Sequence, residues 1–409
     1  MRSIESRAFL SAVLSLTLAQ SLAGCGSESA SDGAAGYTSA GAGPGGAGGS
    51  AGSAGGSSGT GGSAGGDAGI DAAGGKAGQD AAADAPLDAS EAGLPACTPA
   101  PACDAAPPAP GPEREWKHWD SSVIALGGSP NHRGRDLFLN PGDQQWVIGK
   151  FAYGAVDKDM KDEEVDLYLL RNCAGSWEKL ATVSTTEEGA HPMVEGVEDD
   201  GGRVFYQIPA AQQLGIGRHR IHMILAGDLS SADLFIEVVP KGTAVFVSDI
   251  DGTLTLEETE EYGSLLTGSL SGIRPGAPEA FQALVAKGYR PFYMTARPEW
   301  LVGRTREFLT ARGLPDGIVH TTLGKTGALG SSAAEYKTGE LNVMNSRGLR
   351  PHYAFGNTDT DAKAYNDTGI TPADHRIFVQ YTDEAYGGRR IEAYTELVPE
   401  FTGLPEVCE

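Results

Sequence analysis

The chain has 409 residues and carries 54 acidic against 31 basic side chains, which gives a formal net charge of −23 at pH 7. This balance argues against nucleic acid and anionic lipid surfaces as diffuse electrostatic partners, because both attract proteins with an excess of basic side chains. An anionic ligand must therefore be held locally, by a metal ion and a few cationic side chains.

Residues 1–24 are typical of a signal peptide, since two arginines precede an apolar stretch that is too short to span a membrane. The segment ends in Leu-Ala-Gly before Cys25, which resembles the lipobox of bacterial lipoproteins. We therefore expect an exported protein that is lipidated at Cys25 and anchored to a bacterial membrane, the outer membrane in particular. The alternative is an ordinary signal peptide with a cysteine near its end by chance.

Residues 25–112 are rich in glycine, alanine and serine and cannot bury a core, so they predict a disordered tether. Four cysteines remain besides Cys25, an even number that is consistent with two disulfides in an oxidising compartment. Cys97 with Cys103 is the local pairing, which leaves Cys173 with Cys408. The sequence does not choose among the alternative connectivities.

Residues 113–240 contain short runs of β-type residues separated by glycine, asparagine and aspartate, and they predict an antiparallel, immunoglobulin-like β-sandwich. The expected strands are Ser121 to Leu126, Gln145 to Tyr153, Val165 to Leu170, Trp177 to Thr185, Arg203 to Ile208, Arg218 to Leu225 and Ala232 to Val239.

Residues 241–409 switch to alternating strands and helices, which predicts a doubly wound, Rossmann-like α/β domain. The expected strands are Thr243 to Ser248, Tyr289 to Met294, Gly317 to Thr321, His352 to Phe355 and Arg376 to Gln380. The expected helices are Pro278 to Lys287, Glu299 to Ala311, Ala333 to Asn345 and Thr360 to Asn366.

Two carboxylates follow the first strand of this domain, in the sequence Asp249-Ile-Asp251-Gly252-Thr253. Ligand sites in open α/β sheets lie at the carboxyl ends of the strands. Two like charges so close together are costly unless a cation is bound or one carboxylate is protonated. The pair therefore predicts a metal-assisted reaction, and the alternative is a solvated acidic turn.

Further polar residues are expected at the same edge of the sheet. Thr295 follows the second strand, Lys337 lies on a helix, and Asn357 and Asp361 follow a later strand. Carboxylates, a hydroxyl and an ammonium suit phosphoryl transfer, in which catalysis is mostly positioning and charge neutralisation. Mg²⁺ prefers oxygen ligands and keeps several waters, so it is the expected cation.

In this order, DIDGT, TAR, Lys337 and GN followed by Asp361 resemble the four motifs of the haloacid dehalogenase (HAD) superfamily. The resemblance implies that Asp249 attacks phosphorus and that Asp251 protonates the leaving oxygen. It further implies a phosphate-binding set and a Mg²⁺-binding set. The phosphate-binding residues would be Thr295, Lys337, Gly252 and Thr253, and the Mg²⁺ ligands would be Asp249, the main chain of Asp251, Asp361 and Asn357.

Within that superfamily the strings DIDGTLT, GYRPFYMTAR, YKTGEL and HYAFGNTDTDAKAY look like lipin-type phosphatidate phosphatases, which also join a sandwich to this domain. The resemblance implies hydrolysis of phosphatidate or a related lipid phosphate at a membrane reached through Cys25. The chain departs from lipins in lacking an evident amphipathic N-terminal helix.

Two other functions remain open. One is a phosphatase of soluble phosphomonoesters, and the other is a non-catalytic lipoprotein that binds lipid or a partner. The stretch from Thr255 to Gly272 is too short for a large cap domain, so an uncovered site that suits a bulky or membrane-embedded substrate is expected. Arg297 and Arg274 are interpreted as structural surface residues, with headgroup contact as the alternative.

Overall fold

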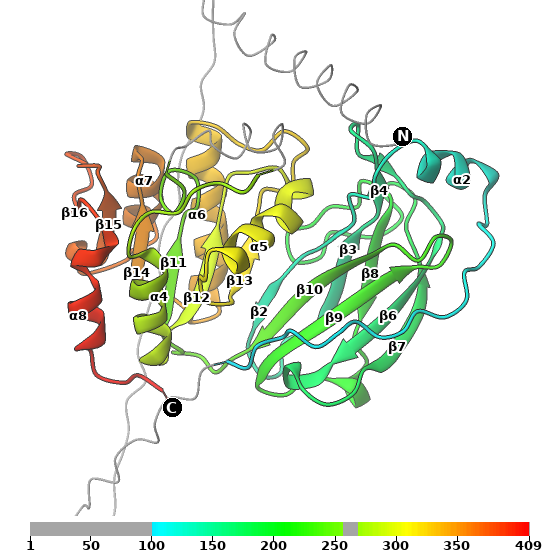
Figure 1. The fold of residues 1–409 in the computed structure, drawn as a ribbon, viewed down its shortest axis with the longest axis horizontal. Helices are drawn as coiled ribbons and strands as arrows, with labels where there is room; N and C mark the ends of the chain where they lie inside the picture. Colours follow the sequence, from blue (N-terminus) through cyan, green and yellow to red (C-terminus); the bar gives the residue numbers. More distant parts are fainter. Residues whose placement is uncertain (1–99, 257–268, 409) are drawn as a thin grey trace, which may run out of the picture. The chain divides into compact units, whose positions relative to one another are not determined.

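The computed structural model describes residues 100–256 and 269–408. The predicted signal peptide, Cys25 and residues 25–99 of the predicted tether lie outside these ranges, as does most of the stretch after Thr255. Two folded parts follow one another along the chain, a β-sandwich and an α/β domain (Figure 1).

The sandwich consists of two sheets around one apolar core. One sheet has the order β1-β3-β8, made of Arg133–Gly134, Trp146–Lys150 and Arg203–Gln207. The other has the order β2-β10-β9-β6-β7, made of Leu137–Leu139, Ser231–Val238, Gly217–Leu225, Glu164–Leu170 and Glu178–Ser184. A small hairpin of β4 (Ala152–Tyr153) and β5 (Lys158–Asp159) extends beside them. Strand β2 runs parallel to β10, so the sandwich is not wholly antiparallel as predicted.

One predicted strand is wrong. The residues from Ser121 to Leu126 belong to helix α2 (Trp119–Leu126). Trp119, Val123 and Leu126 recur at helical spacing, and this short apolar run fits a helical period as well as a strand. The other six predicted strands are present, with ends shifted by one residue where they differ, and with the stretch from Gln145 to Tyr153 divided into β3 and β4.

The α/β domain has a six-stranded, wholly parallel sheet. Its order is β13-β12-β11-β14-β15-β16, made of Ile318–His320, Arg290–Met294, Val245–Ser248, Pro351–Gly356, Arg376–Val379 and Arg389–Ile391. The chain moves outward from β11 to β12 and β13, then returns to the other side of β11 with β14. The strand order therefore reverses between β11 and β14, which is where an open α/β sheet forms its ligand crevice.

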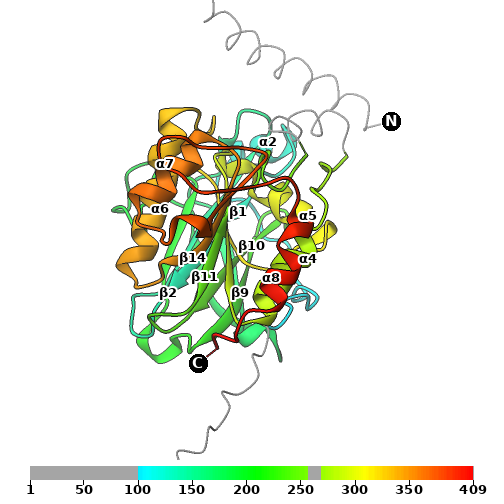
Figure 2. The same ribbon diagram turned by 90° about the vertical axis from the view of Figure 1, so that its left-hand side faces the viewer.

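Helices cover both faces of this sheet (Figure 2). The α-helices are α4 (Ala277–Ala286), α5 (Val302–Ala311), α6 (Ser331–Ser346), α7 (Asp359–Asp367) and α8 (Val398–Thr402). Short 3₁₀ helices lie in this domain at Glu299–Leu301, Ala373–His375 and Tyr394–Glu396. Two more lie in the sandwich, at Arg171–Cys173 and Ala210–Gln212. The four predicted helices are present, and strand β16 and helix α8 were not expected.

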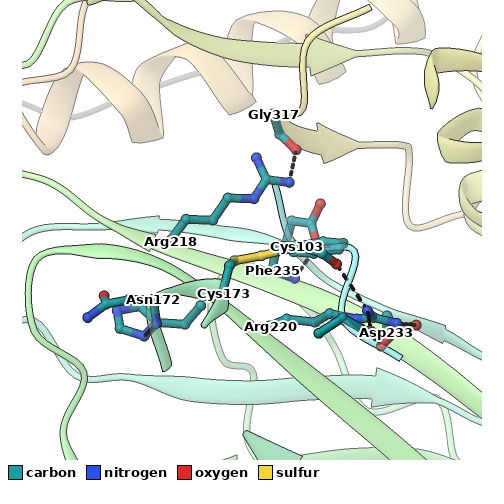
Figure 3. The surroundings of a disulfide bond; sticks show 11 residues. Cys103, Asn172, Cys173, Arg218, Arg220, Asp233, Phe235 and Gly317 are labelled. Atoms are coloured by element: carbon teal, nitrogen blue, oxygen red, sulfur yellow. Dashed lines mark hydrogen bonds and ion pairs between the residues drawn. A yellow bond between two sulfur atoms is a disulfide. The ribbon is translucent and has the colours of Figure 1, made fainter. Parts of the chain in front are cut away.

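The sandwich also holds the segment that precedes it. Cys103 forms a disulfide with Cys173, so the predicted pairings of Cys97 with Cys103 and of Cys173 with Cys408 are both wrong (Figure 3). Arg220 donates to the main-chain oxygens of Cys103 and Ala105. Cys408 is also in a disulfide. Cys103 and Cys173 are 70 residues apart in the chain, and only the folded sandwich brings them together.

Candidate functional site

Three buried ionic side chains meet where β11 and β14 end. The Lys337 ammonium, on α6, lies 2.8 Å from Oδ1 of Asp249 and 2.5 Å from Oδ1 of Asp361. All three residues are at most 4% exposed. Asp249 follows β11 directly, and Asp361 is in the first turn of α7, which follows β14. The parallel sheet thus brings together carboxylates that are 112 positions apart in the chain.

Neutral oxygens extend this cluster toward the surface. The Thr253 hydroxyl donates to Oδ1 of Asn357 at 2.7 Å and lies 3.1 Å from Oδ2 of Asp249. Asn357 is half-buried and is linked to Asp249 through the Thr253 hydroxyl. Gly252 has a φ of 70°, in the left-handed region that favours glycine, and its N–H donates to Thr255 Oγ1.

Asp251 points to a different partner. Arg297 holds both of its carboxylate oxygens, with Nη2 at 2.7 Å from Oδ1 and Nε at 3.0 Å from Oδ2. The Thr295 hydroxyl also donates to Oδ2 of Asp251, at 2.8 Å. The structure therefore joins Thr295 and Arg297 to Asp251 through hydrogen bonds that do not involve Lys337.

Arg297 is the residue whose role the sequence did not reveal. It is 2% exposed and donates to Thr305 as well as to Asp251, so it is structural but does not lie on the surface. Its position in TAR, two residues after a strand-end threonine, was the available signal. Arg274 is also structural, because its guanidinium donates to the main-chain oxygens of Gly252 and Leu256.

When both carboxylates of the cluster of Asp249, Asp361 and Lys337 are ionised, one negative charge is uncompensated. Burial, together with the neighbouring carboxylates of Asp361 and Asp251, raises the pKa of Asp249 to about 8 against the opposing effect of Lys337. Burial alone would lower the pKa of Lys337, but the two carboxylates outweigh it and raise that pKa. One ammonium between two buried carboxylates leaves a site that favours an additional cation or proton.

Asp361 also has a structural task. Its Oδ2 accepts hydrogen bonds from the main-chain N–H groups of Asn357 and Thr358 and from the Thr358 hydroxyl. Asp361 and Thr358 form a capping box at the start of α7. The presence of Asp361 alone is therefore not evidence of a metal site, because the helix start uses the same carboxylate.

The donor atoms fit Mg²⁺ in kind, since two carboxylates and an amide oxygen are hard oxygen ligands. Within residues 100–256 and 269–408, no group of three or more histidine, cysteine, aspartate or glutamate side chains is arranged to hold a metal ion. A bound Mg²⁺ would therefore complete its coordination with water and ligand oxygens. Asp249, Asp361 and Asn357 would hold it, and it would neutralise a bound phosphate.

Comparison with known proteins gives two adjacent matches to family models. Residues 130–238 match the β-sandwich domain of PITM 1-3, and residues 246–380 match the LNS2 domain of PITM 1-3. The matches point to the PITM family. They cover the folded sandwich and the α/β domain in the order in which this chain joins them.

Curated relatives agree with the family models. Membrane-associated phosphatidylinositol transfer protein 2 of Mus musculus is 30% identical over 64% of this chain and 18% of its own length. Protein retinal degeneration B of Drosophila melanogaster is 28% identical over 63% of this chain and 19% of its own. The chain thus spans about a fifth of the length of these relatives.

Solved structures add nothing to this comparison. Amylomaltase from Corynebacterium glutamicum matches 44% of this chain and 22% of its own, with 14% identity and a TM-score of 0.17.

In the part of the chain that the structure describes, no helix is both long and apolar enough to cross a membrane.

These findings correct the predicted family and localisation. The chain resembles PITM proteins rather than a lipin-type phosphatidate phosphatase on a bacterial lipoprotein. The relatives are animal proteins, so the prediction of a bacterial outer-membrane lipoprotein is wrong. The strand-end motifs describe the acidic site itself, and they do not distinguish a lipin-type protein from the PITM proteins that this chain matches.

Proposed function

We propose that the α/β domain binds the phosphomonoester headgroup of a membrane lipid, together with Mg²⁺, at the carboxyl ends of β11 and β14. The observation that carries this proposal is the buried cluster of Asp249, Asp361 and Lys337, with the half-buried Asn357 beside it. With both carboxylates ionised, as metal binding requires, the cluster is net negative and would repel a phosphate by itself. A divalent cation reverses this sign, so headgroup binding should require the metal.

Two features favour a lipid over a soluble phosphomonoester. Leu256 directly follows the acidic loop and is 49% exposed, and Leu329 is 86% exposed. The N–H of Ala328, beside Leu329, donates to the main-chain oxygen of Ala296 in the TAR segment. Apolar side chains thus protrude near the site, where an acyl chain or a bilayer surface would contact them. The relatives are named as membrane-associated phosphatidylinositol transfer proteins, which supports a lipid ligand.

Vesicle co-sedimentation tests this function. The full chain is mixed with vesicles of phosphatidylcholine alone, or with added phosphatidate or phosphatidylinositol, in Mg²⁺ or EDTA. We expect the strongest binding to phosphatidate vesicles, because only its headgroup is a phosphomonoester, and loss of that preference in EDTA. Asp249→Asn should abolish the preference, whereas Asp359→Asn, an exposed acid at the start of α7, should keep it. Equal binding to all three vesicles would reject the proposal.

Hydrolysis of the phosphomonoester is the second candidate, because both acids of a HAD-type reaction are present. In that reaction Asp249 forms a bond to phosphorus and Asp251 protonates the leaving oxygen. Both oxygens of Asp251 are held by Arg297 and one also by Thr295. Proton transfer would require Asp251 to leave this pair, which is why we place binding before catalysis.

Release of inorganic phosphate distinguishes the two candidates. Phosphatidate vesicles and a soluble phosphomonoester are incubated with the wild-type chain and Asp249→Asn, with Mg²⁺ or EDTA. Metal-dependent release that Asp249→Asn abolishes would establish catalysis. Binding without release would leave the domain as a headgroup-binding module.

A further inference from the structure

Arginines of the sandwich form ion pairs with two acids that lie close in sequence to residues of the site. Glu299 lies two residues after Arg297 and forms ion pairs with two sandwich residues. Arg203 contacts it through Nη1 at 3.0 Å and Nη2 at 3.2 Å, and Arg133 through Nε at 3.0 Å. All three side chains are at most 10% exposed.

Each of these arginines also pairs with an aspartate of the sandwich. Arg133 makes a bidentate pair with Asp157 at 2.8 Å, and Arg203 pairs with Asp200 at 2.6 Å. Burial alone would raise the pKa of Glu299, but the guanidiniums lower it. Glu299 is thus a carboxylate anion bound by two sandwich arginines that are themselves paired with other acids.

The position of Glu299 restricts the segment that carries Arg297. Only Pro298 separates the two residues, and the proline ring fixes its own φ. The main-chain oxygen of Arg297 accepts hydrogen bonds from the N–H and hydroxyl of Thr322, at 3.1 and 3.0 Å. The main chain of Arg297 is therefore fixed in position, and its guanidinium reaches Asp251 from there.

A third sandwich arginine reaches the helix that carries Lys337. Arg135 contacts Glu340 at 2.6 Å and donates to the main-chain oxygen of Thr321 at 3.3 Å. Glu340 lies three positions after Lys337 on α6, so both belong to one turn. His320 contacts the other oxygen of Glu340 at 2.5 Å. These contacts fix the rotation of α6 that aims Lys337 at Asp249 and Asp361.

We propose that Arg133, Arg203 and Arg135 are positioning residues of the phosphate site, which makes the sandwich part of the binding machinery. This inference rests on the proposed function for its ligand. The sandwich acts through Glu299 on Arg297 and Asp251, and through Glu340 on Lys337. Headgroup affinity therefore depends on residues that never touch the headgroup.

The alternative is that these ion pairs only hold two domains together, and a matched pair elsewhere tests it. Glu237 on β10 lies 3.5 Å from Arg290, which begins β12 and so lies at the opposite edge of the sheet. Glu237 is 2% exposed. Glu237→Gln therefore weakens a buried contact between the same two parts without touching the site.

The experiment compares the full-length wild type with Glu299→Gln, Arg135→Gln and Glu237→Gln. Affinity for soluble dihexanoyl-phosphatidate with Mg²⁺ is measured by calorimetry, well below each melting temperature. We expect Glu299→Gln and Arg135→Gln to weaken binding by about tenfold or more, because small displacements of positioned groups are costly. Glu237→Gln should lower the melting temperature and leave affinity unchanged. Equal affinity in all four proteins would overturn the inference.

Hydrogen exchange separates failure of this inference from failure of the proposed function. Glu299→Gln should speed exchange in residues 295–301 and in 249–255, whereas Glu237→Gln should leave 249–255 unchanged. If the wild type binds no phosphatidate, the proposed function fails, and the exchange result still decides whether the sandwich positions the site. Unchanged exchange at 249–255 in Glu299→Gln would reject the positioning role.

Discussion

At the scale of single residues, Lys337 decides the charge of the site. Its ammonium is the cation shared by Asp249 and Asp361, both of which are buried. Removing one partner of a buried ion pair leaves uncompensated charge in a medium that solvates it poorly. The same ammonium lies where a divalent cation would find its carboxylate ligands, so a bound metal would share these oxygens with Lys337.

Lys337→Met should therefore have two effects. The free energy of unfolding should fall by about 3–5 kcal/mol, because two carboxylates lose their counter-ion. Added Mg²⁺ should raise the melting temperature of the variant more than that of the wild type, because the freed oxygens can bind it. Thermal melts in Mg²⁺ and EDTA measure both effects.

Lys363→Met, on the exposed face of α7, is the control for that experiment. It removes a lysine whose partner, Asp367, is exposed to solvent, so its stability should change little. An identical response to Mg²⁺ in the wild type and in Lys337→Met would contradict the idea that lysine and metal share ligands.

At the scale of elements, the end of β14 and the start of α7 fit together closely at Gly356. A Cβ atom at this position would lie 2.5 Å from Cβ and 2.7 Å from Cγ of Asp361. The strand can therefore approach the helix only with glycine at this position. The close approach puts Asp361 within reach of Lys337 while Asp361 caps α7.

Gly356→Ala should displace Asp361 from Lys337. We expect a loss of about 1–3 kcal/mol in the free energy of unfolding from overpacking, together with loss of phosphatidate binding. Urea denaturation and vesicle co-sedimentation are the measurements.

Gly339→Ala provides the matched control, because Gly339 is exposed on α6 and a Cβ there meets nothing within 4 Å. Alanine should stabilise that helix by about 1 kcal/mol and leave binding intact. Normal binding by Gly356→Ala would show that the site tolerates movement of Asp361.

At the scale of the whole molecule, the contact between the sandwich and the α/β domain combines a small apolar part with many buried charges. Phe138 of the sandwich packs edge-on against Phe292 of β12, with ring centroids 6.2 Å apart. Asp136 accepts from the N–H of Val319 and pairs with Arg306. Stability of this contact should therefore depend on pH.

Glu340 gives that dependence a direction. Burial alone would raise its pKa, but Arg135 and His320 lower it to about 2, against an ordinary value of 4.5. A lowered pKa stabilises the folded state above pH 4.5, and this stabilisation is lost as the pH falls from there toward 2. The loss should be on the order of 3 kcal/mol.

Chemical denaturation at a series of pH values between 7 and 2.5 checks this prediction. Glu340→Gln should be less stable than the wild type at neutral pH, and its stability should fall less steeply below pH 4.5. Parallel curves for the two proteins would mean that another carboxylate controls acid sensitivity.

Much of the fold follows from local patterns. The alternation of buried strands and amphipathic helices after residue 241 predicts the strands β11 to β15 and the helices α4 to α7, because each period reports which face is buried. Six of the seven strands predicted for the sandwich are present for the same reason. The stretch from Ser121 to Leu126 fails because six residues are too few to separate a helical period from a strand. Strand β16 and helix α8 are three and five residues long, which is too short for a clear pattern.

The sequence by itself determined which chemical groups stand at the ends of the strands, because a parallel sheet brings those ends to one edge. Only the tertiary structure decided how the groups are shared. It pairs Lys337 with Asp249 and Asp361. It pairs Asp251 with Arg297 and joins Cys103 to Cys173 in a disulfide. It also anchors Glu299 and Glu340 to sandwich arginines. The physical reason is that ion pairs and disulfides depend on distances of a few ångströms between distant parts of the chain, which no local spacing encodes.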